Sequence, residues 1–186
     1  MEADWEVEIG PGAPIIDARW DGFVDLRRAP QLARNLPEVE NLPTLEGALV
    51  RLNSAQSPVW TAKCDVWQLT ERDAIDPYEM AAPPESALHG WGCYIDLLPR
   101  SDQQWIVPEM AVSTCKYLCG VLHEIPQPCC RADLVIRRAM IAPAHTNLGI
   151  TAYLTACGPT KPEANGILQM ALGRLVDAVC GHSAIE

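Results

Sequence analysis

The fold is decided by residues 132–157, which read ADLVIRRAMIAPAHTNLGITAYLTAC. Two apolar runs, Ala132 to Ile141 and Gly149 to Cys157, flank a turn-like segment from Pro143 to Asn147. Short apolar runs separated by proline and asparagine are typical of two strands joined by a turn. We therefore expect a β-hairpin at this point in the chain.

Three helices are expected around this hairpin, and each begins at a proline, which is tolerated in the first turn of a helix. One begins at Pro43, one at Pro108 and one at Pro162, the last of them ending near Gly181. In the helix from Pro108, apolar residues recur at the helical period. They are Ala111, Cys115, Leu118, Cys119 and Leu122.

Three further strands are indicated by alternation of apolar and polar residues. One lies near the N-terminus, around Trp5 to Ile9, one runs from Val59 to Gln68, and one runs from Cys93 to Leu98. In the second of these strands, the alternation predicts that four residues face the helices. They are Trp60, Ala62, Cys64 and Val66.

Two segments have no sustained period. Between Pro14 and Leu26, the pairs Ile15-Ile16 and Phe23-Val24 could each form a short strand, but glycine and proline interrupt any longer element. The segment from Thr70 to Gly90 is acidic and contains three prolines. We expect it to be a long connection of the kind that often carries function.

The expected order is strand, helix, strand, strand, helix, strand, strand, helix. This order predicts a single α+β domain over residues 1–186, a two-layer sandwich in which helices cover one face of a largely antiparallel sheet. The segments from Leu42 to Trp67 and from Val107 to Ile136 both contain a helix, a turn and then a strand. This similarity suggests a duplicated ferredoxin-like unit, although the two segments share few residues.

Composition excludes several classes of partner. The 186 residues are 48% hydrophobic and 20% charged, which is typical of a soluble globular domain. The formal net charge is -10 and there is no basic run, so we expect no nucleic-acid binding. No apolar stretch is long enough to span a membrane, and the acidic N-terminus does not resemble a signal peptide. We therefore expect no membrane partner and a cytoplasmic location.

The eight cysteines raise the question of disulfides or a metal site. Cys115, Cys119 and His123 are spaced four apart, which stacks side chains along one side of a helix as metal ligands require. Both cysteines, however, belong to an apolar stripe, and no Cys-x2-Cys pair is present. We interpret the cysteines as reduced structural thiols and expect neither a metal nor another cofactor.

Motifs of known enzyme classes are also lacking, since the chain has no G-x-S-x-G, no H-E-x-x-H and no P-loop sequence. Asp65, Asp96 and Asp133 all fall within expected strands and could pair as an acid–base site. A single aspartate in a strand is more often solvated or paired with an arginine. We therefore favour the structural interpretation of these aspartates over a carboxylate-based active site.

The sheet face opposite the helices is the strongest candidate site. Strand periodicity assigns to it a mixture of aromatic and charged side chains, which suits a polar ligand or a partner surface. The candidate residues are Lys63, Asp65, Trp67, Tyr94, Asp96, Arg137 and Tyr153, with Thr151 and Thr155 beside them. The alternative is an ordinary solvated face with cross-strand pairs.

Two functions are compatible with this face. The one we favour is a binding or assembly module that forms a homodimer through the open face, because exposed aromatic patches are costly for a monomer. The alternative is a small-molecule enzyme with a pocket between the face and the segment from Thr70 to Gly90. A deep cavity containing at least two of four charged residues would favour the enzyme. They are Lys63, Asp65, Asp96 and Arg137.

Overall fold

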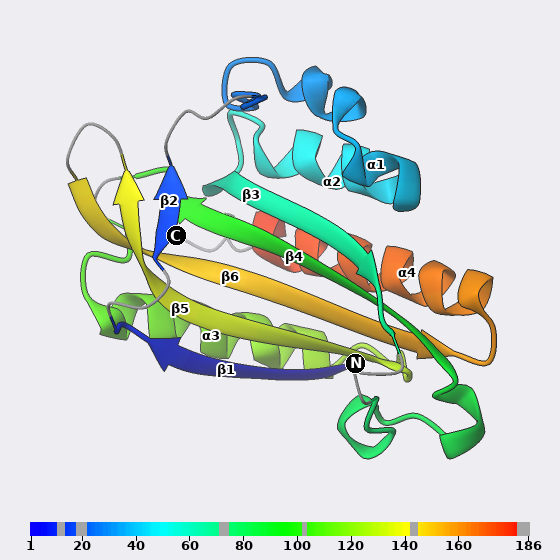
Figure 1. Ribbon diagram of the computed structural model, residues 1–186. Helices are drawn as coiled ribbons and strands as arrows, with labels where there is room; N and C mark the ends of the chain where they lie inside the picture. The colour runs from blue at the N-terminus through cyan, green and yellow to red at the C-terminus, as the bar shows by residue number, and fades with distance from the viewer. Residues whose placement is uncertain (11–13, 18–21, 71–74, 102–103, 142–144, 182–186) are drawn as a thin grey trace.

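A computed structural model describes residues 1–10, 14–17, 22–70, 75–101, 104–141 and 145–181 (Figure 1). Its centre is a mixed sheet with the strand order β1-β5-β6-β4-β3, in which the short strand β2 also pairs with β5. The hairpin pair β5–β6 and the pairs β4–β6 and β3–β4 are antiparallel, whereas β1 and β2 are parallel to β5. The strands are β1 (Glu2–Glu8), β2 (Ile15–Asp17), β3 (Val59–Gln68), β4 (His89–Pro99), β5 (Cys130–Ile141) and β6 (His145–Gly158).

The long helices lie on one side of this sheet (Figure 1). Helix α3 packs against β1 and β5, helix α4 packs against β4 and β6, and helix α2 packs against α4. The helices are α1 (Glu38–Asn41), α2 (Thr44–Leu52), α3 (Pro108–His123) and α4 (Lys161–Gly181), with 3-10 turns η1 (Pro30–Asn35), η2 (Tyr78–Met80) and η3 (Pro84–Ser86). The α+β class and the helix-covered face are as expected, and the sheet is mixed because β1 and β2 join it in parallel.

A hydrophobic core fills the space between the sheet and the helices. Alternate residues of the central strands contribute to it, and each large side chain buried there stabilises the fold by roughly 1.5–3 kcal/mol. They include Ile95, Leu97, Leu134, Ile136, Ile150 and Leu154, which meet Leu118, Leu122, Leu168 and Leu172 of the helices. Within the described ranges, no helix is long and apolar enough to cross a membrane.

Strand β3 contains a β-bulge that corrects one sequence-based prediction. Thr61 pairs with Leu97 and Cys64 pairs with Ile95, so the two residues between Thr61 and Cys64 lie opposite the single residue Asp96. An extra residue exchanges the two faces of a strand, because side chains alternate along it. The prediction that Trp60 and Ala62 face the helices is therefore wrong.

Beyond the bulge, Cys64 and Val66 pack against the helix-side core as predicted. Before it, Trp60 and Ala62 pack with Leu98 on the opposite face of the sheet. Before the bulge, the odd-numbered residue Thr61 faces the helices. After it, the even-numbered residues Cys64 and Val66 face them.

A buried asparagine ties this bulge to the end of α2. Asn53 is 2% exposed, and its Nδ2 donates hydrogen bonds to the carbonyl of Leu49 and to Oγ1 of Thr61, both at 2.8 Å. The backbone N–H of Thr61 in turn donates to Oδ1 of Asn53 at 3.1 Å. Thr61 was expected to point away from the helices, and this contact holds it on their side.

We predict that Asn53→Ala destabilises the protein by about 2–3 kcal/mol, because it leaves buried backbone and hydroxyl groups without partners. Urea denaturation would measure the loss. Asn41→Ala is the matched control, since the Asn41 side chain is exposed and its loss should change stability by no more than about 0.5 kcal/mol. Equal stability of the two variants would show that Asn53 does not hold the bulge.

Candidate functional site

The seven candidate residues all lie on strands of the sheet face that is not covered by the helices. Their sequence neighbours Cys64, Val66, Cys93 and Ile95 belong to the helix-side core, so alternation places the candidates on the opposite side. Register pairs Asp65 with Tyr94, Tyr94 with Tyr153 and Asp96 with Thr151. Asp65 is exposed, Asp96 is buried, and the other five are half-buried.

Three aromatic rings form a row across this face, which we call the aromatic ladder: Trp67 on β3, Tyr94 on β4 and Tyr153 on β6. The ring centroids of Trp67 and Tyr94 are 6.3 Å apart, and those of Tyr94 and Tyr153 are 5.9 Å apart. Both pairs are tilted, by 50° and 46°, which is a favourable geometry for aromatic rings. The ladder is therefore a preformed surface.

An arginine continues the row onto the next two strands. The guanidinium of Arg137, on β5, lies 5.8 Å from the Tyr153 ring centroid, within reach of a cation–π interaction. Its Nη2 is also 2.8 Å from Oε2 of Glu8 on β1. The row from Trp67 to Glu8 thus involves β3, β4, β6, β5 and β1.

Glycine 92 lets Trp67 lie flat on the sheet. The two residues are register partners, and a Cβ built on Gly92 would lie 2.4 Å from Cε2 and Cζ2 of the indole ring. Real Cβ atoms essentially never come this close to another heavy atom. The first ring of the ladder therefore depends on the missing side chain at position 92.

Asp96 is a buried carboxylate at the centre of the same face. It is 6% exposed, and Oγ1 of Thr151 donates a hydrogen bond to its Oδ1 at 2.6 Å. Burial raises the pKa of Asp96 above 3.8, although the Thr151 hydrogen bond and the charges of Lys63 and Arg137 oppose this shift. Keeping this group ionised inside the protein costs folding stability.

Tyr94 remains a neutral phenol at physiological pH. Burial, together with the nearby carboxylates of Asp96 and Asp65, raises the pKa of Tyr94 to about 12. Its hydroxyl can therefore donate or accept a hydrogen bond, but it cannot serve as an anion there.

One end of the face is covered by the segment that follows β1. Ile15 of β2 packs with Trp60 and Leu98, and a Cβ on Gly149 would lie 2.7 Å from its Cδ1. The guanidinium of Arg27 lies 4.3 Å from the Trp60 ring centroid. These contacts bury the end of the face where β3 begins.

The other end is covered by the connection between β3 and β4. Leu69 and Ile75 lie over Gly90, where a Cβ would be 2.5 Å and 2.8 Å from their Cδ1 atoms. Met80 of η2 packs with Cys129 and Cys157. Between the two covered ends lies an uncovered region, which we call the central strip. It consists of the aromatic ladder with Lys63, Asp65, Asp96 and Arg137.

A cavity of about 260 Å3 lies between this connection and the face, where the alternative hypothesis expects a pocket. From the sheet, it is lined by Arg131, Asp133 and Thr155. From the connection, it is lined by Leu69, Ile75, Asp76, Glu79 and Met80. Arg131 already binds Asp133, with Nε donating to Oδ1 at 2.7 Å, so this cavity has an excess of carboxylates.

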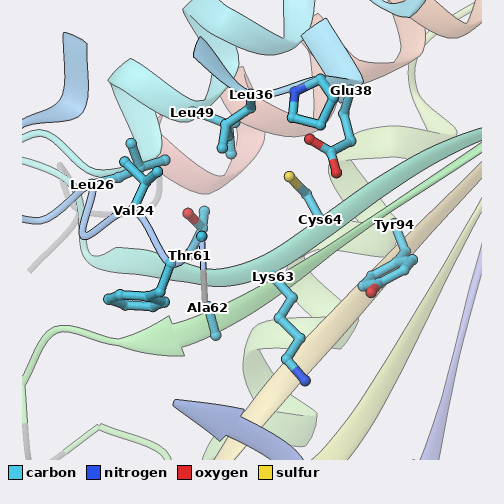
Figure 2. A pocket seen from close by; sticks show the side chains of 13 residues that line it. Val24, Leu26, Leu36, Glu38, Leu49, Thr61, Ala62, Lys63, Cys64 and Tyr94 are labelled. Carbon is cyan, nitrogen blue, oxygen red and sulfur yellow. The ribbon is translucent and has the colours of Figure 1, made fainter. Parts of the chain in front are cut away.

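A larger cavity, of about 510 Å3, lies at the outer edge of β3, and we call it the edge cavity (Figure 2). Of the four charged residues whose clustering in a cavity would favour an enzyme, only Lys63 lines it, and none lines the smaller cavity. Residues 22–38 form much of its wall. Sequence reasoning missed this site because that segment has no periodic pattern.

The helix cysteines are buried as expected from the apolar stripe. Cys115 is 0% and Cys119 is 6% exposed, and burial raises their pKa values to about 12 and about 11. His123 lies instead at the surface, where its Nε2 is 3.9 Å from Glu2. In the described part of the chain, no three His, Cys, Asp or Glu side chains are grouped so that they could hold a metal ion.

Comparisons with protein-family models, curated proteins and solved structures give no significant match. The chemistry available at the site therefore follows from its own geometry. That geometry is an aromatic surface with a guanidinium at one end and a buried carboxylate beside it.

We predict that Gly92→Ala displaces Trp67 and destabilises the protein by about 1–3 kcal/mol, because the new methyl group overlaps the indole ring. Urea denaturation and tryptophan fluorescence would measure both effects. In a Trp67→Ala background, the same change should cost much less. An undiminished cost in that background would show that the methyl group acts elsewhere.

We predict that Asp96→Asn stabilises the protein at neutral pH. Because the folded-state pKa of Asp96 lies above 3.8, the contribution of Asp96 to wild-type stability should fall as pH rises from 3.8 through the raised value. The amide keeps an acceptor for Thr151 and removes the buried charge. Urea denaturation between about pH 4 and about pH 7 should show the advantage of the variant growing with pH. A variant that is less stable at neutral pH would mean that Lys63 and Arg137 outweigh the cost of burial.

Proposed function

We propose that this chain is a binding or assembly module and that a second copy of the chain covers the central strip of the open sheet face. The observation that carries the proposal is the aromatic ladder, whose three rings remain half-buried on a face without helices. Tyrosine, tryptophan and arginine are the residues most enriched at the energetic centres of interfaces. Covering the ladder would remove apolar surface from water.

The charges of the face support a symmetric arrangement. Along the sheet, one row runs from the bulge at Lys63 through Asp96, Thr151 and Val135 to Glu6. A two-fold axis parallel to the strands would bring β1 of one copy over β3 of the other, and so Glu6 toward Lys63. This contact between opposite charges would occur twice.

A like-charge contact limits the affinity. In the next row, Asp65 lines up through Tyr94, Tyr153 and Asp133 with Asp4. The same two-fold axis would bring Asp65 of one copy toward Asp4 of the other, and the net charge of -10 on each chain adds to the repulsion. The proposed dimer should therefore tighten as salt is added.

We predict that the wild-type protein sediments as a homodimer and that the double variant Trp67→Glu, Tyr153→Glu sediments as a folded monomer. Two buried carboxylates in the contact would be strongly unfavourable, whereas neither side chain belongs to the hydrophobic core. Analytical ultracentrifugation and circular dichroism would measure assembly and folding. Met170→Glu, at a 54% exposed position on α4, is the control and should remain dimeric.

A wild-type protein that stays monomeric over a wide concentration range would overturn this proposal. Unfolding of the double variant would contradict the assignment of Trp67 and Tyr153 to the open face.

A second candidate function is a small-molecule enzyme that uses the cavity between the face and residues 75–88. The cavity itself favours this candidate, since Asp76, Glu79 and Asp133 line it together with Arg131. Its carboxylates suit a ligand that donates hydrogen bonds. If the wild-type protein were monomeric, the homodimer would be excluded and the enzyme would become the favoured function of the face.

Three further expectations belong to this proposal. The units α2–β3–β4 and α3–β5–β6 have the same order and join through β4 and β6, which supports descent from a duplicated ferredoxin-like unit. The eight unpaired cysteines, six of them buried, support a cytoplasmic location. The net charge of -10 supports the absence of nucleic-acid binding.

A further inference from the structure

The edge cavity is a second candidate site, at the edge of the sheet, and it shares Lys63 and Tyr94 with the central strip of the open face. Its volume of about 510 Å3 falls within the range of roughly 300–1,000 Å3 that is typical of small-molecule sites. It lies where residues 22–38 pass the outer edge of β3, so its wall combines two segments that are distant in sequence. Such a site can enclose a ligand that an open sheet face cannot.

Apolar side chains form one wall of the edge cavity. Figure 2 shows Val24, Leu26, Leu36 and Leu49 together on the side toward α2. Cys64 extends toward them from β3, and burial raises the pKa of its thiol to about 12. The thiol is therefore uncharged at physiological pH and adds to the apolar surface.

One carboxylate interrupts this apolar wall. Glu38 is half-buried, and Figure 2 shows its carboxylate turned toward the Cys64 side chain. Among the hydrogen bonds and ion pairs of the described residues, none involves the Glu38 carboxylate. Among the described residues that line the cavity, Lys63 is the cation, and it extends in the other direction from β3 (Figure 2).

We propose that the edge cavity binds a small organic cation, a primary amine on an apolar body. The ammonium group would donate hydrogen bonds to the Glu38 carboxylate, and the apolar body would pack against Leu36 and Leu49. Hydrogen bonds between ionised partners are about twice as strong as neutral ones. The net charge of -10 would also raise the local concentration of cations.

Anionic and neutral apolar ligands fit the cavity less well. An anion would lie against Glu38, and the two like charges would repel each other within a poorly solvated space. A purely apolar ligand would remove water from the carboxylate without replacing its hydrogen bonds. The site therefore selects for a cation by penalising the alternatives.

Three probes with the same apolar body test the proposal: 4-phenylbutylamine, 4-phenylbutan-1-ol and 4-phenylbutyrate, with affinities measured by isothermal titration calorimetry at neutral pH. We expect the amine to bind about tenfold more tightly than the alcohol, and the carboxylate to bind most weakly. Glu38→Gln should remove the preference for the amine and leave the affinity for the alcohol nearly unchanged. Leu36→Trp, which fills the cavity, should weaken the binding of both.

The matched control is Glu40→Gln, on the same short helix at an exposed position that does not line the cavity. It removes one negative charge, as Glu38→Gln does, and should keep the tenfold preference. If Glu40→Gln and Glu38→Gln had the same effect, the preference would come from the net charge of the protein and the proposal would be wrong.

The test is independent of the homodimer. Trp67 and Tyr153 do not line the edge cavity, so the monomeric double variant Trp67→Glu, Tyr153→Glu should still bind the amine more tightly than the alcohol. Equal affinity of the wild-type protein for the amine and the alcohol would overturn the proposal. So would the absence of binding by all three probes at millimolar concentration.

Discussion

The extra residue in strand β3 is the constraint on which both candidate sites depend. The strand carries a bulge between Thr61 and Cys64. Odd-numbered residues therefore face the helices before the bulge, and even-numbered residues face them after it. The first half turns Trp60 onto the open face, where Ile15 and Arg27 cover it. The second half turns Lys63, Asp65 and Trp67 onto the same face, while Cys64 and Val66 point to the helices. In a regular strand, Trp60 and Lys63 would lie on opposite faces of the sheet.

Charge arrangement explains why the remaining open edge of the sheet is tolerated. Strand β1 is an edge strand, and an edge strand of neutral residues would offer its free backbone groups to another chain. Here Glu2, Asp4, Glu6 and Glu8 alternate along it, and Arg131 and Arg137 of β5 lie close to two of them. The acidic edge discourages strand addition, and the two arginines neutralise part of the negative charge on the adjacent face. In the proposed dimer, the contact would therefore form on the face and not along this edge.

Local sequence patterns predicted most of the fold. The order of five strands and three helices was correct, and the strand from Val59 to Gln68 has the predicted bounds, because alternation and helical spacing depend on near neighbours. The candidate face came together for the same reason, since a period of two determines which residues share a side. Its use by a ligand or a partner stays a prediction.

What the sequence did not predict depends on contacts between distant segments. Asn53 holds the bulge in β3, because it donates a hydrogen bond to the Thr61 hydroxyl and accepts one from the Thr61 backbone N–H. No local sequence pattern predicts such a contact. The parallel addition of β1 to β5 is likewise a non-local pairing. The edge cavity was missed because its carboxylate, Glu38, lies in a short helix whose place is set by the surface it packs on.

The two proposed sites are not energetically separate, because Lys63 and Tyr94 belong to both. A cation bound beside Glu38 would reduce the net charge of each chain, which stands at -10. Less negative chains repel one another less, so occupancy of the edge cavity would favour association through the open face. Linkage is reciprocal, and the dimer would therefore bind the cation more tightly than the monomer does. Under both proposals, the shared strand edge makes assembly sensitive to a small ligand without any change of fold.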